Sequence, residues 1–446
     1  MKAISLVLLF VLCSISLTAQ PANTKAVSQT PSAGASSSQA SASAPASRRI
    51  TAYTLPPDLY QKARHLNRMR FVYRIFSFFY ALFVLWLILQ ARWSARFRDW
   101  AERVSRFRIL QALIFTALFA ITFALLQLPF DILEEWVAKL YHISVQTWPS
   151  WAGDWAKGQV LLIVVGGVLV WILYAVIRRS PRHWWFYFWL ISLPILLFLF
   201  FISPFVIEPM FNQFEPLASK DPQLIPLLER VTRQAGEEIP PQRMFWMKAS
   251  DKTNFTNAYV TGFGASKRIV IWDTTIAKET PDEVIVDFGH EMGHYVLGHI
   301  WKGLLFSAAL FLALIYAGYR SIDWLLSCCG TRWHIRSLDD WASLPALLLI
   351  LTVFGSAAAV AENTFSRYQE HQADVYAMEV THGIIPDPGQ AAAHDFELAG
   401  EIGLSDPDPN PINVFLFFDH PPIPDRILFF VTYNPWIQGR KPQFVN

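Results

Sequence analysis

Six apolar stretches constrain this chain more than any other feature, because each is close to the roughly 17–25 residues that a helix needs to cross a bilayer. They lie at residues 75–91, 109–128, 159–177, 184–206, 303–319 and 343–361. The composition agrees with this, since 53% of the residues are hydrophobic and only 16% are charged. Backbone hydrogen bonds inside a bilayer must be satisfied within the protein, so these stretches predict a polytopic bundle of membrane helices.

Net charge and cysteine content exclude a nucleic-acid-binding surface and a cysteine-based site. The formal net charge of +2 is too small for a nucleic-acid-binding surface, and no basic run is interleaved with aromatic residues, so no nucleic acid is expected as a partner. The three cysteines, Cys13, Cys328 and Cys329, cannot form a disulfide framework or a thiolate metal cluster. A metal site in this chain must therefore use histidine and carboxylate ligands.

Composition divides the chain into four parts. Residues 1–20 have one lysine, a short apolar core and small residues near their end, which predicts a signal peptide, or an anchor if it is not cleaved. Residues 21–48 are rich in Ser, Ala and Pro and are expected to be a disordered linker. Residues 49–206 are expected to form a membrane domain with four transmembrane helices, and residues 207–446 a second domain that contains a transmembrane hairpin at 303–361.

Local patterns give a coarse structure for this second domain. The β-branched run RIVIWD at 268–273 predicts a strand. The segment from residue 362 begins with a helical pattern and becomes rich in proline, so its final part is expected to be irregular.

Arginines bear on the orientation of the bundle. The loop at 92–108 carries six arginines and the turn at 178–183 carries three, whereas 129–158 has two lysines against several acids. By the positive-inside rule the first two loops are cytoplasmic, and both polar segments then lie on the non-cytoplasmic side. Five basic residues between 62 and 74 argue for the opposite orientation, so the side of the membrane stays open.

The stretch GHEMGHYVLGH at 289–299 contains an HExxH motif. On a helix, His290 and His294 share a face and can hold one metal ion. Glu291 lies beside them, where it can act as a general base on a water that zinc activates. The motif therefore predicts a catalytic zinc site whose third protein ligand must come from another part of the chain.

The third ligand is not the histidine of the longer HExxHxxGxxH pattern, because Gly298 and His299 miss both required positions. His299 lies off the metal-binding face and is expected to be structural or to line a chamber. The membrane hairpin offers Glu370 instead. His294 stands nine residues before its first span and Glu370 nine residues after its second. If both helices continue out of the bilayer, the two groups rise to a similar height of roughly 14 Å.

Two further side chains accompany Glu370. Asp374 is four residues on, on the same face, and could orient a ligating imidazole through its other nitrogen. His371 points about 100° away from Glu370 and is a weaker ligand candidate. The alternative for all of these residues is an ordinary solvated helix face.

With these residues the chain resembles the type 1 CAAX prenyl proteases, which are integral-membrane zinc metalloproteases with a glutamate as the third ligand. The resemblance extends over most of the chain from about residue 50. It is carried by GHEMGHYVLGH, by NAYVTGFGASKRIVIWDTTI at 257–276, by SRYQEHQAD at 366–374, by PMFNQFEPL at 209–217 and by FFDHPPIPDRI at 417–427. It implies that Glu370 is the third zinc ligand and Asp374 its neighbouring partner residue.

The resemblance also implies three roles that the residues alone do not establish. Asn257, Ala258 and Tyr259 resemble the family's substrate-binding strand edge, where an extended peptide would pair with a strand; an ordinary strand edge is the alternative. His420, which by itself is a histidine in a Pro-rich turn, resembles the family histidine that stabilises the developing oxyanion. Arg426 would then buttress His420.

The expected fold class is mainly α: a ring of six or seven transmembrane helices that encloses a chamber, joined to a metalloprotease α+β domain with a small β-sheet. The seventh helix would be the N-terminal apolar stretch. The predicted function is a membrane-embedded zinc metalloendopeptidase that acts on membrane-associated or C-terminal peptides, prenylated ones among them. The alternative is a catalytically silent, zinc-containing membrane chaperone, channel or scaffold. The expected partners are a peptide or protein substrate and the lipid bilayer, and the sequence leaves the physiological substrate and the oligomeric state open.

Overall fold

A computed structural model describes residues 48–262, 267–437 and 439–445 of the chain. The predicted signal peptide or anchor at 1–20 lies outside the described residues, and so does the predicted linker apart from Arg48.

Long apolar helices dominate the described part of the chain, where six are long and apolar enough to cross a membrane. They are α2 (Pro57–Gln90), α4 (Arg108–Leu140), α5 (Trp148–Arg179), α6 (Trp184–Val206), α11 (His299–Cys329) and α12 (Leu344–Thr381). Each predicted apolar stretch falls on one of these helices, which confirms the membrane bundle. Five of the helices have 31 to 38 residues, more than the roughly 20 that a bilayer requires, so they continue beyond it.

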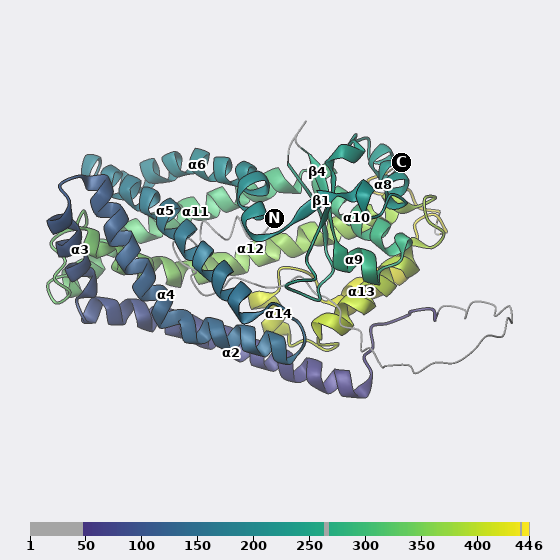
Figure 1. The fold of residues 1–446 in the computed structure, drawn as a ribbon, viewed down its shortest axis with the longest axis horizontal. Coiled ribbons are helices and arrows are strands. Elements are labelled where there is room, and N and C mark those ends of the chain that lie inside the picture. Colours follow the sequence, from purple (N-terminus) through teal and green to yellow (C-terminus); the bar gives the residue numbers. More distant parts are fainter. Residues whose placement is uncertain (1–47, 263–266, 438, 446) are drawn as a thin grey trace.

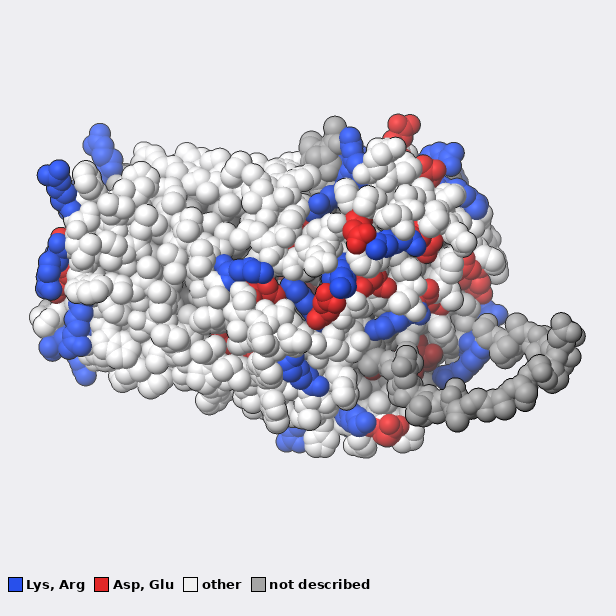
Figure 2. Space-filling model, viewed as in Figure 1, with Lys and Arg blue, Asp and Glu red and all other residues white. Residues whose placement is uncertain are grey.

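The bundle and the rest of the molecule differ in surface charge. Figure 2 shows a broad surface without charged side chains over the bundle, with Lys and Arg gathered at its far end and mixed charges over the opposite end. The far end is the one that carries the short helix α3 (Trp93–Val104), which connects α2 to α4 (Figure 1). Large apolar side chains such as Leu305 are exposed on the bundle helices, as expected for a surface that contacts lipid.

A small mixed sheet lies at the other end of the bundle (Figure 1). Its described strands are β1 (Phe214–Pro216), β2 (Met244–Met247), β3 (Ala258–Thr261) and β4 (Arg268–Trp272), in the order β1-β2-β4-β3. The predicted strand at 268–273 is confirmed as β4, which pairs parallel with β2 and antiparallel with β3. Ile269, Val270 and Ile271 are fully buried, as is typical of a central strand covered on both faces. Strand β3 is left at the sheet's edge.

Short helices surround the sheet and connect it to the bundle. They are α7 (Glu208–Phe211), α8 (Leu224–Gln234), α9 (Asp273–Lys278) and α10 (Pro281–Val296). Helix α10 begins at a capping box, in which Thr280 and Glu283 satisfy each other's backbone N–H groups. This cap fixes where the helix that carries the HExxH motif starts.

Helix α10 packs against α12 through glycine. A Cβ atom added at Gly293 would lie 3.1 Å from the Cα atom of Ala373 and 3.0 Å from the Cβ atom of Tyr376. Gly289, one turn earlier, is similarly close to Val380 and Thr381. The two helices can therefore approach each other only because these positions lack side chains.

The two helices of the predicted hairpin differ in how they leave the bundle. Helix α12 is continuous from Leu344 to Thr381, so Glu370 lies on an outward extension of a membrane helix, as predicted. The same prediction for His294 is wrong, because α10 and α11 are two separate helices and not one continuous helix. Gly298 adopts a left-handed conformation with φ of 67°, which ends α10 and starts a new helix at His299.

The Pro-rich C-terminal segment is partly helical and partly irregular, so the prediction of irregular structure holds for 433–437 and 439–445 but is wrong where three helices form. It forms α13 (Pro388–Gly403), α14 (Pro411–Phe417) and α15 (Ile423–Thr432). Pro388 and Pro411 occupy the first position of their helices, where proline needs no hydrogen-bond partner for its nitrogen, and Asp387 and Asn410 cap these helices.

We predict that Gly293→Ala destabilises the protein although alanine is the better helix former. The added methyl group must displace α12, which costs about 1–3 kcal/mol. The matched control is Gly153→Ala on α5, where nothing lies within 4 Å of the added Cβ atom, and it should be neutral or slightly stabilising. Thermal unfolding in detergent micelles measures both variants, and equal melting temperatures would show that α10 and α12 are not in tight contact.

Candidate metal centre

Two histidines of α10 and one glutamate of α12 converge at the end of the bundle. The Nε2 atoms of His290 and His294 are 3.1 Å apart. Glu370 places Oε2 at 3.3 Å from His290 Nε2 and Oε1 at 3.5 Å from His294 Nε2. One ligand atom from each residue lies within 4.8 Å of the others, so the three could hold a metal ion.

The separations fit zinc. Tetrahedral zinc with bonds of about 2.0–2.1 Å places its ligand atoms about 3.3–3.5 Å apart, and the three measured separations are 3.1, 3.3 and 3.5 Å. Two imidazoles and a carboxylate are also a ligand set that leaves the fourth position of a catalytic zinc open. The donor atoms therefore suit zinc in both chemistry and spacing.

A buried ion pair between Asp374 and Arg426 contacts the Nδ1 side of His290, opposite to the metal position. Its Nδ1 atom lies 2.9 Å from Oδ1 of Asp374, and Arg426 of α15 donates from Nε to Oδ2 of Asp374 at 2.9 Å. Asp374 and Arg426 are both buried. A carboxylate at Nδ1 orients the imidazole so that Nε2 faces the metal position, and the arginine compensates the buried negative charge.

A second contact supports His294. His299, which is buried, brings its Nδ1 atom to 3.1 Å from Nδ1 of His294 and its Nε2 atom to 3.2 Å from Oε1 of Gln372. His299 was expected to lie off the metal-binding face of α10, and Gln372 was not predicted. The helical pattern on both sides of Gly298 conceals the change of chain direction at this residue, just before His299.

Glu291 lies next to His290 on α10 and is not one of the three converging groups. Burial raises the pKa of Glu291, and the charge of Glu370 contributes to the rise. Asp287, one turn earlier, was not found from the sequence. Burial, together with the neighbouring carboxylates of Asp395 and Glu291, raises the pKa of Asp287 to about 8. Two acids four residues apart on the HExxH helix are the sequence signal that could have identified it.

His420 lies in the turn between α14 and α15. Its Nε2 atom is 3.4 Å from Oε2 of Glu370, and its Nδ1 atom is 2.9 Å from Oδ1 of Asp419. Its side chain is 40% exposed, so it lies beside the metal position and remains accessible. Arg426 contacts Asp374 and, at 3.9 Å, Oε2 of Glu370, the same oxygen that His420 approaches. Its role in buttressing His420 stays a prediction.

Asn257, Ala258 and Tyr259 lie at the start of the edge strand. The backbone N–H of Asn257 donates to Thr275, and its carbonyl accepts from the backbone N–H of Trp272. Ala258 and Tyr259 belong to β3, which among the described strands pairs with β4 alone. The Tyr259 hydroxyl donates to Glu208 at 2.9 Å, which ties the edge strand to the end of the bundle.

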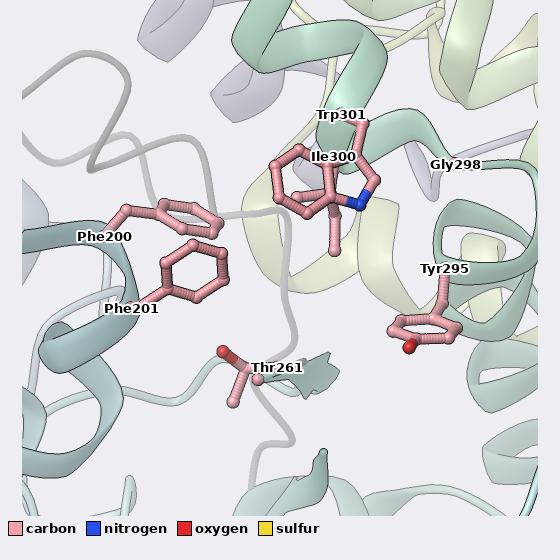
Figure 3. A pocket seen from close by; sticks show the side chains of 8 residues that line it. Phe200, Phe201, Thr261, Tyr295, Gly298, Ile300 and Trp301 are labelled. Atoms are coloured by element: carbon pink, nitrogen blue, oxygen red, sulfur yellow. The ribbon is translucent and has the colours of Figure 1, made fainter. Parts of the chain in front are cut away.

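An aromatic pocket of about 190 Å³ lies between the end of the edge strand and helices α6, α10 and α11. Figure 3 shows Phe200 and Phe201 of α6 facing Trp301 of α11 across this space, with Tyr295 and Thr261 at its border. Tyr295 follows His294 directly and Thr261 is the last residue of β3. The pocket therefore borders the end of β3 and the last turn of α10, the helix that carries His290 and His294.

Comparisons with known families match consecutive parts of the chain. The family model described as "CAAX prenyl protease N-terminal, five membrane helices" matches residues 41–213, and the model of peptidase family M48 matches residues 218–431.

Individual relatives agree with these matches. The uncharacterized metalloprotease YhfN of Bacillus subtilis (strain 168) is 37% identical over 351 residues, which are 77% of this chain and 79% of YhfN. The CAAX prenyl protease 1 homolog of Arabidopsis thaliana is 27% identical over 309 residues, covering 67% of this chain and 68% of that protein. A crystal structure of Ste24p from S. mikatae has a TM-score of 0.72 at 23% identity, covers 85% of this chain and 90% of its own, and shows the same fold.

We predict that Glu370→Gln weakens zinc binding on the order of 100-fold or more, because loss of a ligand charge should exceed the 10–100-fold effect of losing an outer partner. The control is His371→Asn on the adjacent residue, whose ring stacks edge-on against Phe429 and should not affect zinc. Metal content after dialysis against a chelator measures both. Equal zinc retention in the two variants would place the metal elsewhere.

Proposed function

This chain belongs to peptidase family M48, a family of zinc metalloproteases, and on that premise we propose that it is an endopeptidase for apolar, membrane-associated or C-terminal peptides, prenylated ones included. The predicted resemblance to the CAAX prenyl proteases is confirmed, and the chain is a multi-pass membrane zinc metalloprotease. What it cuts is the proposed part. The observation that carries the proposal is the convergence of His290, His294 and Glu370 where the membrane helices end.

In this proposal His290, His294 and Glu370 hold the zinc. When bound, zinc supplies a Lewis acid that lowers the pKa of water toward about 7 and polarises a peptide carbonyl. Glu291 is the general base: it takes the proton from the attacking water and returns it to the leaving amine. Asp374 and Arg426 keep His290 in the orientation that ligation needs, since the carboxylate fixes the ring and the guanidinium fixes the carboxylate.

His420 is proposed to stabilise the negative charge that develops on the carbonyl oxygen. Asp419 accepts from its Nδ1 atom and so orients the ring, and an imidazole protonated on both nitrogens can donate a hydrogen bond from Nε2. The proposal is supported by the 3.4 Å separation between Nε2 and Oε2 of Glu370, because the reacting carbonyl must come close to the ligand set.

The substrate is proposed to lie along β3 as an added strand. The outer edge of β3 offers backbone hydrogen bonds that give affinity without reading side chains. The aromatic pocket at the end of β3 then selects for a large apolar side chain or a lipid group. Both features suit apolar peptides that arrive from the bilayer surface.

Glu291→Gln distinguishes this enzyme from a membrane chaperone, channel or scaffold that keeps zinc only for stability. We expect proteolysis of a fluorogenic peptide to fall about 10²–10⁴-fold because the base is lost, while zinc content stays unchanged because Glu291 is not a ligand. Asp282→Asn, near the start of the same helix, is the control and should retain full activity. Proteolysis that survives Glu291→Gln with zinc bound would rule out the proposed mechanism.

Phe201→Ala tests the pocket. We expect kcat/KM to fall about 10–100-fold for peptides that carry Leu or Phe at one particular position, with little change for the matching alanine peptides. A peptide set that varies one position at a time identifies that position. Phe198→Ala is the control, since Phe198 lies on the same helix, is 61% exposed and does not line the pocket. A uniform loss over all peptides would mean that the pocket does not contact the substrate.

A further inference from the structure

A chain of three hydrogen bonds runs from His294 away from the metal position. His294 Nδ1 is 3.1 Å from His299 Nδ1, and His299 Nε2 is 3.2 Å from Oε1 of Gln372. The Gln372 side-chain nitrogen donates to the Tyr368 hydroxyl at 3.2 Å. Helices α10, α11 and α12 each contribute to this chain, which the proposed mechanism does not use.

The direction of these bonds sets the protons on both rings. Gln372 donates from its amide nitrogen to Tyr368 and turns its amide oxygen toward His299, and an amide oxygen can only accept. His299 therefore carries its proton on Nε2, and the Nδ1 atom of the neutral ring presents a lone pair. That lone pair accepts from His294, which then has its proton on Nδ1 and a lone pair on Nε2, the atom that faces the metal position.

We infer that His299 is a positioning residue for the zinc ligand His294, and that Gln372 sets its tautomer. The inference rests on the proposed function, because it takes His294 to be a ligand. It assigns to His294 the kind of support that Asp374 gives to His290, with a neutral imidazole and amide in place of a carboxylate.

The break between α10 and α11 makes this contact possible. On an unbroken helix His299 would lie about 140° around the axis from His294. The left-handed Gly298 turns the chain so that the two rings are 5.1 Å apart, at an interplanar angle of 74°. Gln369 of α12 holds this turn by donating to the backbone carbonyl of His299 at 3.2 Å.

Substitution of Gln372, which is half-buried, tests the tautomer separately from the packing. Gln372→Met has a similar shape but cannot accept from His299, so we expect zinc to bind about 10-fold more weakly. Gln372→Glu still accepts from His299 Nε2, and zinc affinity should stay within about threefold of the wild type or increase. Competition with a chromophoric chelator measures zinc affinity in the full-length protein in detergent, and the absorption spectrum of the cobalt-substituted protein reports the ligand geometry.

A second variant and a stability measurement keep the outcomes separate. His299→Leu should weaken zinc binding about 10–100-fold, and the thermal unfolding of each metal-free variant shows whether folding has changed. Equal zinc affinity for Gln372→Met and Gln372→Glu would overturn the inference and leave the metal site intact. A wild-type protein that binds no zinc through His294 would instead overturn the proposed function.

Discussion

The close packing of α10 against α12 is the constraint on which the site depends. Gly289 and Gly293 each directly precede a histidine, so the approach that brings their Cα atoms against α12 also carries His290 and His294 toward Glu370. Two glycines inside one helix cost about 1 kcal/mol each relative to alanine. The cap at Thr280 and the packing against α12 offset this cost, so the helix tolerates the residues that the geometry requires.

Carboxylates on the outer half of α12 organise the rest of the domain around it. Glu370 faces the histidines, Asp374 pairs with Arg426 of α15, and Glu379 accepts from the backbone N–H groups of Phe444 and Val445 at 2.6 and 3.0 Å. A buried carboxylate needs such partners because its desolvation is costly. The C-terminal segment is therefore held to the same helix that carries the third ligand, which explains why it folds over the site although its composition suggests irregular structure.

Much of this architecture follows from the sequence, and the failures have a common physical origin. Apolar length predicted the six long helices, and β-branched residues predicted β4. The position of Glu370 after the membrane hairpin predicted that it meets the histidines, although only α12 leaves the bundle as one continuous helix. The helix interruption at Gly298 was missed because a helical pattern of residues continues on both sides of it. A single residue in a left-handed conformation does not change the periodicity of the sequence. The C-terminal helices were missed because proline was taken as a breaker, whereas at the first turn it is favourable. Contacts between distant segments, such as Arg426 with Asp374, leave no local pattern at all.

The two histidines are supported unequally, and electrostatics gives a reason. Bound zinc and Arg426 would together carry three positive charges, and Glu370, Asp374 and the ionised Glu291 carry three negative ones. A carboxylate behind His294 would give these groups a net negative charge, which disfavours the ionisation of water. Burial, together with the carboxylates of Asp395 and Glu291, already raises the pKa of Asp287 on the same helix. A neutral partner such as His299 orients the ligand without adding negative charge, so the asymmetry preserves the electrophilic character that peptide hydrolysis requires.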